Sequence, residues 1–194
     1  MLAFSEIEFQ VINELENKLS PALTYHNIAH TKDVLKQAVA IAKSEDINDE
    51  EAILLLKVAA LYHDIGFLEV YSGHEEVSCK VASEELANFG FSIHQIQKVC
   101  GMIRATKVPQ QPTNKLEEII CDADLDYQGR DDFFEIGRGL YKEFIDQKVI
   151  SEERSWNLLQ VRFLESHHYF TTTSKNLRQK EKQKHLDTIK ASLA

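Results

Sequence analysis

The segment from Glu50 to Asp64 constrains the fold most, because it is apolar on nearly every side. A helix with apolar side chains all round is usually buried at the centre of a bundle. Asn48 or Asp49 can cap its first turn, and Gly66 is a residue typical of a helix C-terminus. The segment therefore predicts a central helix around which other helices pack.

The rest of the chain also shows helical periodicity, and only 7 glycines and 3 prolines interrupt it. An apolar stripe from Ile7 to Leu19 is expected to stop at Ser20, because proline disfavours a helical conformation in the residue before it. Further helices are expected at 29–43, 75–89, 92–105, 115–127, 131–148, 151–170 and 172–192. The predicted fold class is all-α, a single-domain helical bundle over residues 1–194 without an interior linker.

The composition is that of a globular protein, with a formal net charge of −9. An acidic protein repels the phosphate backbone of nucleic acids and the headgroups of anionic lipids. We therefore expect neither nucleic acid nor a membrane as partner. A small anionic substrate stays compatible with the sequence, because a bound divalent cation would reverse the local field.

Three cysteines, Cys79, Cys100 and Cys121, form an odd set without CxxC spacing. Such residues are typical of small buried side chains in a reducing compartment. No run of about 18 apolar residues occurs, and the first residues do not resemble a signal peptide. We expect a cytoplasmic protein. The oligomeric state stays open, and a homo-oligomer is compatible with the sequence.

His63 and Asp64 end the apolar central segment, where two ionisable residues are unusual. A buried carboxylate must be paired or bound to a metal, because its desolvation is otherwise too costly. An adjacent His and Asp can converge on one ion of Mn²⁺, Fe²⁺, Ni²⁺, Co²⁺ or Zn²⁺. Taken alone, the dipeptide also fits an exposed pair at a helix end.

Two other stretches carry residues of the same types. His26 and His30 share one face if both are helical, whereas His26 lies in the entering loop if the helix starts near His30. Asp122, Asp124 and Asp126 follow an apolar helical stripe. One His, the His-Asp pair and a later Asp from separate helices would provide four ligands, with positions left for water.

Taken together, these motifs resemble the HD superfamily of metal-dependent phosphohydrolases. They read Tyr-His-Asn-x-x-His from Tyr25, Leu-Tyr-His-Asp-Ile-Gly from Leu61 and Asp-Ala-Asp-Leu-Asp from Asp122. The resemblance covers about residues 22–130 and leaves 131–194 as a C-terminal helical extension. It implies an all-α HD fold and one divalent metal ion, with Mn, Ni, Co, Fe, Zn and Mg all open.

The same resemblance implies metal ligation by His30, His63, Asp64 and a late aspartate. The family's late motif aligns Asp124 as that ligand, and Asp122, which would face elsewhere on a helix, is the substitute. The implied catalytic residues are Asp64 and His63. The implied reaction is hydrolysis of a small phosphate ester, mostly of nucleotides or cyclic nucleotides, by a metal-activated water.

Two other functions stay open at this point. A nucleotide-binding sensor could use the same pocket without hydrolysis, although it would not need all four ligands. A different metal-dependent reaction, such as oxygenation, would usually need the larger ligand set of a two-iron site.

Substrate-binding candidates are His26, His74, Arg104 and Lys107. His74 could instead join a second ion, but the later His-His pair used by two-metal relatives is missing between Gly101 and Lys107. The alternative is that His74 begins a helix at the pocket rim. Arg104 and Lys107 could hold phosphate oxygens or simply face solvent.

The histidines at 167 and 168 belong to a stripe that is typical of core packing rather than of metal ligation. The lysine-rich stretch from Lys175 to Lys190 also contains Glu and Asp. It predicts a solvated helix face.

Overall fold

The structure is a computed structural model that describes residues 4–194, and within this range it contains helices and no strand. The predicted all-α fold is confirmed. The α-helices and the two 3₁₀ helices, η1 and η2, follow in the order α1 (Phe4–Lys18), α2 (Ile28–Ser44), α3 (Glu50–Tyr62), η1 (Ile65–Leu68), α4 (His74–Asn88), α5 (Ile93–Ala105), α6 (Lys115–Asp124), η2 (Asp126–Gly129), α7 (Phe133–Asp146), α8 (Glu153–Ser166) and α9 (Thr172–Leu193).

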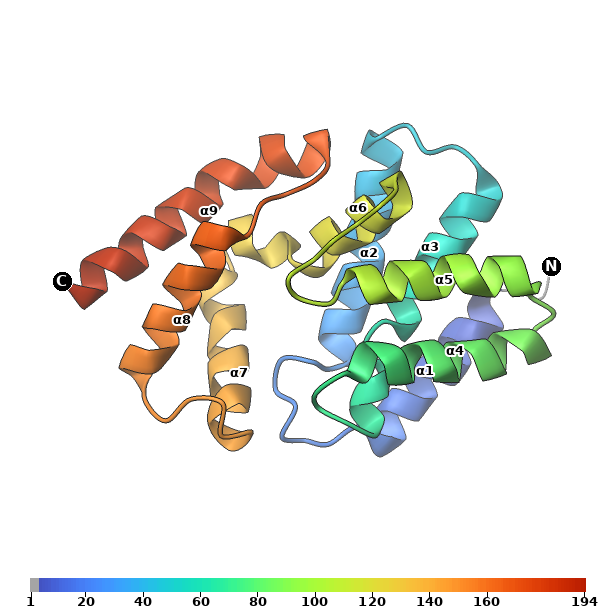
Figure 1. Cartoon of the computed structure of the whole chain (residues 1–194), viewed down its shortest axis with the longest axis horizontal. Coiled ribbons are helices and arrows are strands. Elements are labelled where there is room, and N and C mark those ends of the chain that lie inside the picture. The colour runs from blue at the N-terminus through green and yellow to red at the C-terminus, as the bar shows by residue number, and fades with distance from the viewer. Residues whose placement is uncertain (1–3) are drawn as a thin grey trace.

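The central helix α3 is buried, as its composition predicts. Every residue from Leu55 to Tyr62 except Lys57 is fully buried. The Asp49 side chain caps the helix by accepting a hydrogen bond from the N–H of Ala52 at 2.8 Å. The other helices of the N-terminal part pack around α3 (Figure 1).

The end of α3 differs from the prediction in a way that affects the site. The helix stops at Tyr62 instead of continuing to Asp64, and the chain turns into η1. Gly66 lies inside η1 and does not terminate α3. It is required there because a Cβ atom would lie 2.1 Å from the carbonyl oxygen of His74. This close approach places the beginning of α4 against the segment that carries His63 and Asp64.

Two other predicted helices are too long. The helix expected at 115–127 ends at Asp124 and is followed by η2, and the one expected at 151–170 ends at Ser166. His167 is extended, with φ −70° and ψ 138°. Backbone N–H groups of the segment after α8 are bonded to an aspartate of α6, which takes the place of helical hydrogen bonding.

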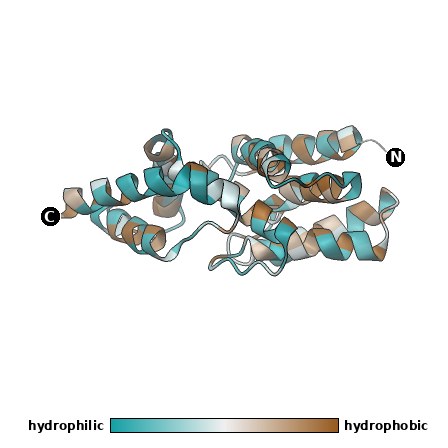
Figure 2. Cartoon of the chain, turned by 90° about the horizontal axis from the view of Figure 1, so that it is seen from above, coloured by the Kyte–Doolittle hydropathy of each residue, from teal (hydrophilic) through white to brown (hydrophobic). Residues whose placement is uncertain are grey.

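The helices form two groups along the long axis of the molecule, α1–α6 on one side and α7–α9 on the other (Figures 1 and 2). One buried apolar cluster lies within α1–α6, and a second combines side chains of α7–α9 with Tyr25, Leu125 and Tyr127. Helix α9 is mainly hydrophilic along its length (Figure 2), as the lysine-rich sequence predicts. The single-domain organisation stays a prediction, and residues 1–3 of that range lie outside the described residues.

None of the helices in residues 4–194 combines the length and the apolar character that crossing a membrane requires.

Candidate metal centre

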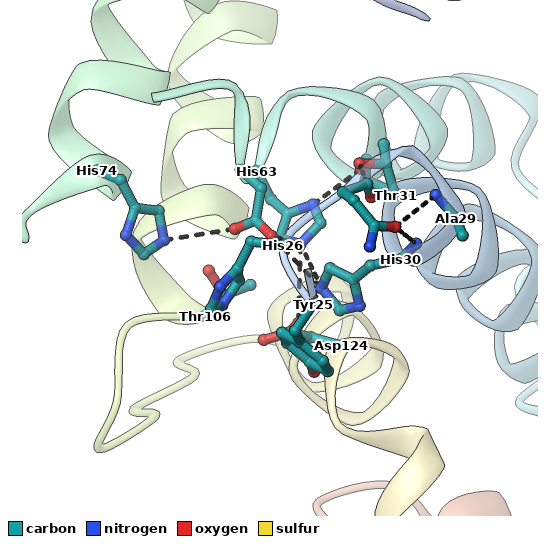
Figure 3. Close-up of polar contacts among 12 residues, drawn as sticks. Tyr25, His26, Ala29, His30, Thr31, His63, His74, Thr106 and Asp124 are labelled. Atoms are coloured by element: carbon teal, nitrogen blue, oxygen red, sulfur yellow. Dashed lines mark hydrogen bonds and ion pairs between the residues drawn. The ribbon is translucent and has the colours of Figure 1, made fainter. Parts of the chain in front are cut away.

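His30 enters the site from the first turn of α2. Asn27 caps this helix, because its side-chain oxygen accepts hydrogen bonds from the N–H groups of Ala29 at 2.9 Å and His30 at 3.3 Å. The Asn27 amide also donates to the carbonyl oxygen of Thr24 at 2.9 Å. The Asn of the Tyr-His-Asn motif therefore fixes the turn that presents His30 (Figure 3).

His63 follows the last residue of α3, and its ring is held in one orientation. Its Nδ1 atom lies 2.9 Å from the carbonyl oxygen of Ala60, which can only accept a hydrogen bond. Nδ1 therefore carries the hydrogen, and in the neutral ring Nε2 keeps a free lone pair. A hydrogen bond of this kind to the outer nitrogen is what metal-ligating histidines commonly have.

The Nε2 atoms of the two histidines converge with two carboxylates. They lie 3.3 Å from each other. Asp64 Oδ2 lies 3.2 Å from His63 Nε2 and 3.4 Å from His30 Nε2. Asp124 Oδ1 lies 3.1 Å from His30 Nε2 and 3.7 Å from His63 Nε2. Ligand atoms of His30, His63 and Asp124 all lie within 4.8 Å of one another.

This donor set fits a single divalent cation. Two ligand atoms that each lie about 2.1 Å from one ion are roughly 3.0–3.4 Å apart in octahedral or tetrahedral geometry, close to the distances observed. Asp64 Oδ2 is buried and has no hydrogen-bond partner. Buried lone pairs that face one another repel unless a proton or a cation lies between them. A cation would satisfy these atoms together.

The charges of the site shift the titration of its members. Burial lowers the pKa of His63, but the adjacent carboxylates of Asp64 and Asp124 outweigh this effect and raise it well above 6.5. Burial likewise opposes ionisation of Asp64, but His63 and His74 hold its pKa well below 3.8. Asp124 is also buried, but its contacts with His30 and His63 lower its pKa to about 2.

Asp122, the substitute for the late ligand, points away from this cluster. Its carboxylate accepts hydrogen bonds from the N–H groups of Phe170 and Thr171, both at 2.8 Å, and from the Thr171 hydroxyl at 2.7 Å. Asp126 pairs with Arg178 at 2.7 Å. Of the three late aspartates, Asp124 is the one that lies beside the histidines.

His26 and His74 lie next to the cluster and line one cavity with Asp64 and Asp124 (Figure 3). His74 Nε2 lies 3.3 Å from Asp64 Oδ1, and the His74 ring stacks on Phe67 with centroids 3.9 Å apart. Helix α4 begins at His74, as the helix-start alternative predicted. These contacts make His74 a partner of Asp64.

The two basic candidates, Arg104 and Lys107, differ in their position relative to the cavity. Lys107 lines the cavity, whereas Arg104 forms an exposed ion pair with Glu76, with Nε 2.9 Å from Oε1. Arg104 is not among the residues that line the cavity. Lys107 is therefore the better placed of the two to meet an anionic ligand.

Glu143 of α7 was not singled out by the sequence, yet its buried carboxylate holds the loop that carries His26. It accepts hydrogen bonds from the N–H of Tyr25 at 2.9 Å, the N–H of His26 at 3.1 Å and the Tyr71 hydroxyl at 3.0 Å. The His26 Nδ1 atom donates to it as well, which leaves His26 Nε2 free. The one local signal was a glutamate on the apolar face of an amphipathic helix, three residues after Leu140.

The cavity has a volume of about 650 Å³. Asp64, Asp124, His26 and His74 lie at one end, and side chains of α7 and α8 form much of the remaining wall. Its size falls within the range of roughly 300–1,000 Å³ that is usual for small-molecule sites. The arrangement is that of a metal centre open to a pocket for an organic ligand.

Comparison with known proteins agrees with this description. The HD domain family model matches residues 27–126, more than half of the chain. The protein therefore belongs to the HD-domain superfamily of metal-dependent phosphohydrolases, as the sequence motifs predicted.

A solved structure shares the fold. It is the crystal structure of a predicted HD superfamily hydrolase from an uncultured Thermotogales bacterium, which is 24% identical in sequence with a TM-score of 0.62. The match covers 97% of this chain and 90% of that one, so it extends over α7–α9 as well. No curated protein matches the sequence.

Proposed function

We propose that this protein is a metal-dependent phosphohydrolase that acts on a small phosphate ester, such as a nucleotide or cyclic nucleotide. The observation that carries the proposal is the convergence of His30, His63, Asp64 and Asp124 at one end of an organic-sized cavity. His30, His63, Asp64 and Asp124 would hold the ion. When bound, a divalent ion supplies Lewis-acid polarisation of a phosphoryl oxygen and makes water more acidic.

The residues of the chain supply the rest. Asp64 is placed to accept a proton from water in the cavity, because its carboxylate is one of the groups that line it. His74 holds the second oxygen of Asp64 at 3.3 Å and so fixes the carboxylate plane. Lys107 is available to bind a phosphate oxygen. His26 Nε2, which keeps the lone pair when Nδ1 donates to Glu143, can accept a hydrogen bond from a hydroxyl group of the ligand.

The acidic groups of the cavity make the ion necessary for binding as well as for reaction. Asp64, Glu75 and Asp124 all line it. A phosphate group approaching these carboxylates would be repelled unless a cation lay between them. A bound cation would also explain how a protein of net charge −9 could accept an anionic substrate.

The test is elemental analysis of the purified protein, followed by phosphatase and phosphodiesterase assays with Mn²⁺, Ni²⁺, Co²⁺ and Mg²⁺. Wild type should release phosphate or a nucleoside monophosphate, Asp64→Ala should lose turnover, and Asp131→Ala, an exposed carboxylate control, should retain it. A metal-replete wild type that raises its melting temperature with a nucleotide but consumes none would instead be a sensor.

A further inference from the structure

We infer that the substrate of this site is a phosphate monoester of a bulky, mainly apolar alcohol. The inference rests on the proposed phosphohydrolase function, but it names an apolar alcohol as the leaving group instead of the nucleoside of a nucleotide.

The cavity continues from the metal centre to a wall formed by two helices of the C-terminal part. Helices α7 and α8 contribute Leu140, Phe144, Trp156, Leu159, Phe163 and Leu164 to this wall. Because Asp64 and Asp124 line the same cavity, a phosphate at the metal centre would point the rest of its molecule towards these side chains. Such a wall stabilises apolar surface that leaves water, and with Gln160 as its one amide it offers few hydrogen-bonding partners to a sugar-like group rich in hydroxyls.

The charges that line the cavity favour a single phosphate. Among the described residues that line it, Lys107 is the one lysine or arginine, and three carboxylates oppose it. With a divalent ion, the three carboxylates and Lys107 would sum to no net charge, so no cationic group would remain for a second phosphate. Each further phosphate would enter an acidic pocket without a cation to match it.

Gln128 adds one polar feature to the apolar end. Its side chain is 1% exposed and lines the cavity, and its Oε1 atom is buried without a hydrogen-bond partner. A buried acceptor of this kind is costly unless a ligand supplies a donor. An N–H or O–H donor on the alcohol would satisfy this atom.

The experiment compares two alkyl esters whose leaving alcohols have similar acidity, methyl phosphate and 2-(2-naphthyl)ethyl phosphate, together with inorganic tripolyphosphate. With the Mn²⁺-loaded protein, kcat/KM for the naphthyl ester should exceed that for methyl phosphate by about a hundredfold, given the apolar area buried. Tripolyphosphate should be a poor substrate. Equal values for the two esters, or a preference for tripolyphosphate, would overturn the inference.

A bulky substitution in the wall tests the apolar part of the cavity independently of the metal centre. Leu159→Trp should fill the cavity and lower kcat/KM for the naphthyl ester at least about tenfold, while methyl phosphate hydrolysis stays within about twofold. The matched control is Leu158→Trp, because Leu158 is 40% exposed and does not line the cavity. Leu140→Trp tests the same wall from α7 if the first variant does not fold. Unchanged selectivity in a folded wall variant would contradict the inference.

Binding of the corresponding phosphonate, which cannot be hydrolysed, distinguishes this inference from the proposed function. If no ester is hydrolysed but calorimetry shows that the phosphonate binds wild type and not Leu159→Trp, the proposed activity fails and the ligand class stands. If both esters are hydrolysed alike, the activity stands and the ligand class fails. If neither hydrolysis nor binding occurs, both fail.

Discussion

At the residue scale, the two histidine nitrogens that face each other at 3.3 Å define how protons and metal compete for the site. Nδ1 of His63 is committed to Ala60, so any added proton at this ring must sit on Nε2, the atom that would bind the ion. The carboxylates that raise the pKa of His63 are also the proposed ligands. Metal uptake therefore has to displace protons.

We expect the late aspartates to differ sharply in metal binding. Asp124→Asn removes an anionic ligand and should weaken Mn²⁺ affinity by at least about a hundredfold, because changes beyond the direct ligands already cost that much. Asp122→Asn should leave the affinity within about twofold but lower the melting temperature, since Asp122 holds the segment before α9. Titration calorimetry with Mn²⁺ measures the first effect. Equal losses of Mn²⁺ affinity in both variants would contradict the assignment of Asp124 as the late ligand.

Metal binding at pH 7 should release protons. The pKa of His63 lies well above 6.5 in the metal-free protein, so Nε2 is protonated at neutral pH and must lose its proton to bind. Apparent affinity should rise with pH until that pKa is passed. Calorimetry in buffers of different ionisation enthalpy measures the released protons, and the same heat in every buffer would contradict the prediction.

The same pKa shifts determine whether the stability of the metal-free protein rises or falls with pH. A raised pKa in the folded state contributes stability that is complete below about pH 6.5 and is lost as the pH rises through the folded value. The lowered pKa values of Asp64 and Asp124 contribute stability that is lost below about pH 3.8. Metal-free protein should thus melt at a lower temperature at pH 9 than at pH 6, unlike the metal-loaded form.

At the element scale, the junction of α3, η1 and α4 builds one side of the metal centre. The Ser78 hydroxyl of α4 donates to the carbonyl oxygen of His63 at 2.8 Å and accepts from the N–H of Gly66 at 2.9 Å. Helix α4 can come this close only because residue 66 has no side chain.

Gly66→Ala should therefore destabilise the protein by about 3 kcal/mol, since the added methyl group meets backbone atoms that cannot move independently. It should also weaken Mn²⁺ binding by displacing α4 from His63. Gly101→Ala is the matched control, because the added Cβ in α5 would approach only the flexible carboxylate of Glu117, at 3.0 Å. That variant should be neutral or gain about 0.5–1 kcal/mol. Urea unfolding measures both, and similar midpoints would refute the expectation.

At the scale of the whole molecule, Glu143 connects the two groups of helices. Its carboxylate is fully buried and links α7 to the loop before α2 and to Tyr71. Its three partner residues, Tyr25, His26 and Tyr71, lie far from it in sequence, so these contacts exist only when both groups are in place.

Glu143→Ala leaves several buried donors unpaired and should cost about 3–5 kcal/mol of unfolding free energy. Contacts with His26 lower the pKa of Glu143 below 4.5, in spite of burial, so its contribution should be present above about pH 4.5 and fade as the pH falls. Glu135→Ala, exposed on the same helix, should change little. Chemical denaturation at pH 7 and pH 4 tests this, and a Glu143→Ala effect as small as that of Glu135→Ala would rule it out.

The sequence by itself determined the helices and the family. Periodicity and capping act over a few residues, and therefore the helix around Leu55 and its Asp49 cap follow from local chemistry. The short motifs around His30, His63 and Asp124 were enough to identify the HD superfamily. Their role as metal ligands stays a prediction, although the structure brings these side chains together.

The tertiary structure alone decided where α3 ends, what Asp122 binds and which side chains form the apolar wall of the cavity. The family motif favoured Asp124, but only the structure shows that Asp122 accepts hydrogen bonds from Phe170 and Thr171, nearly fifty residues later. Glu143 and the wall around Trp156 meet the site across more than a hundred residues of chain. No local pattern records such contacts, because their energies depend on which surfaces the completed bundle brings together.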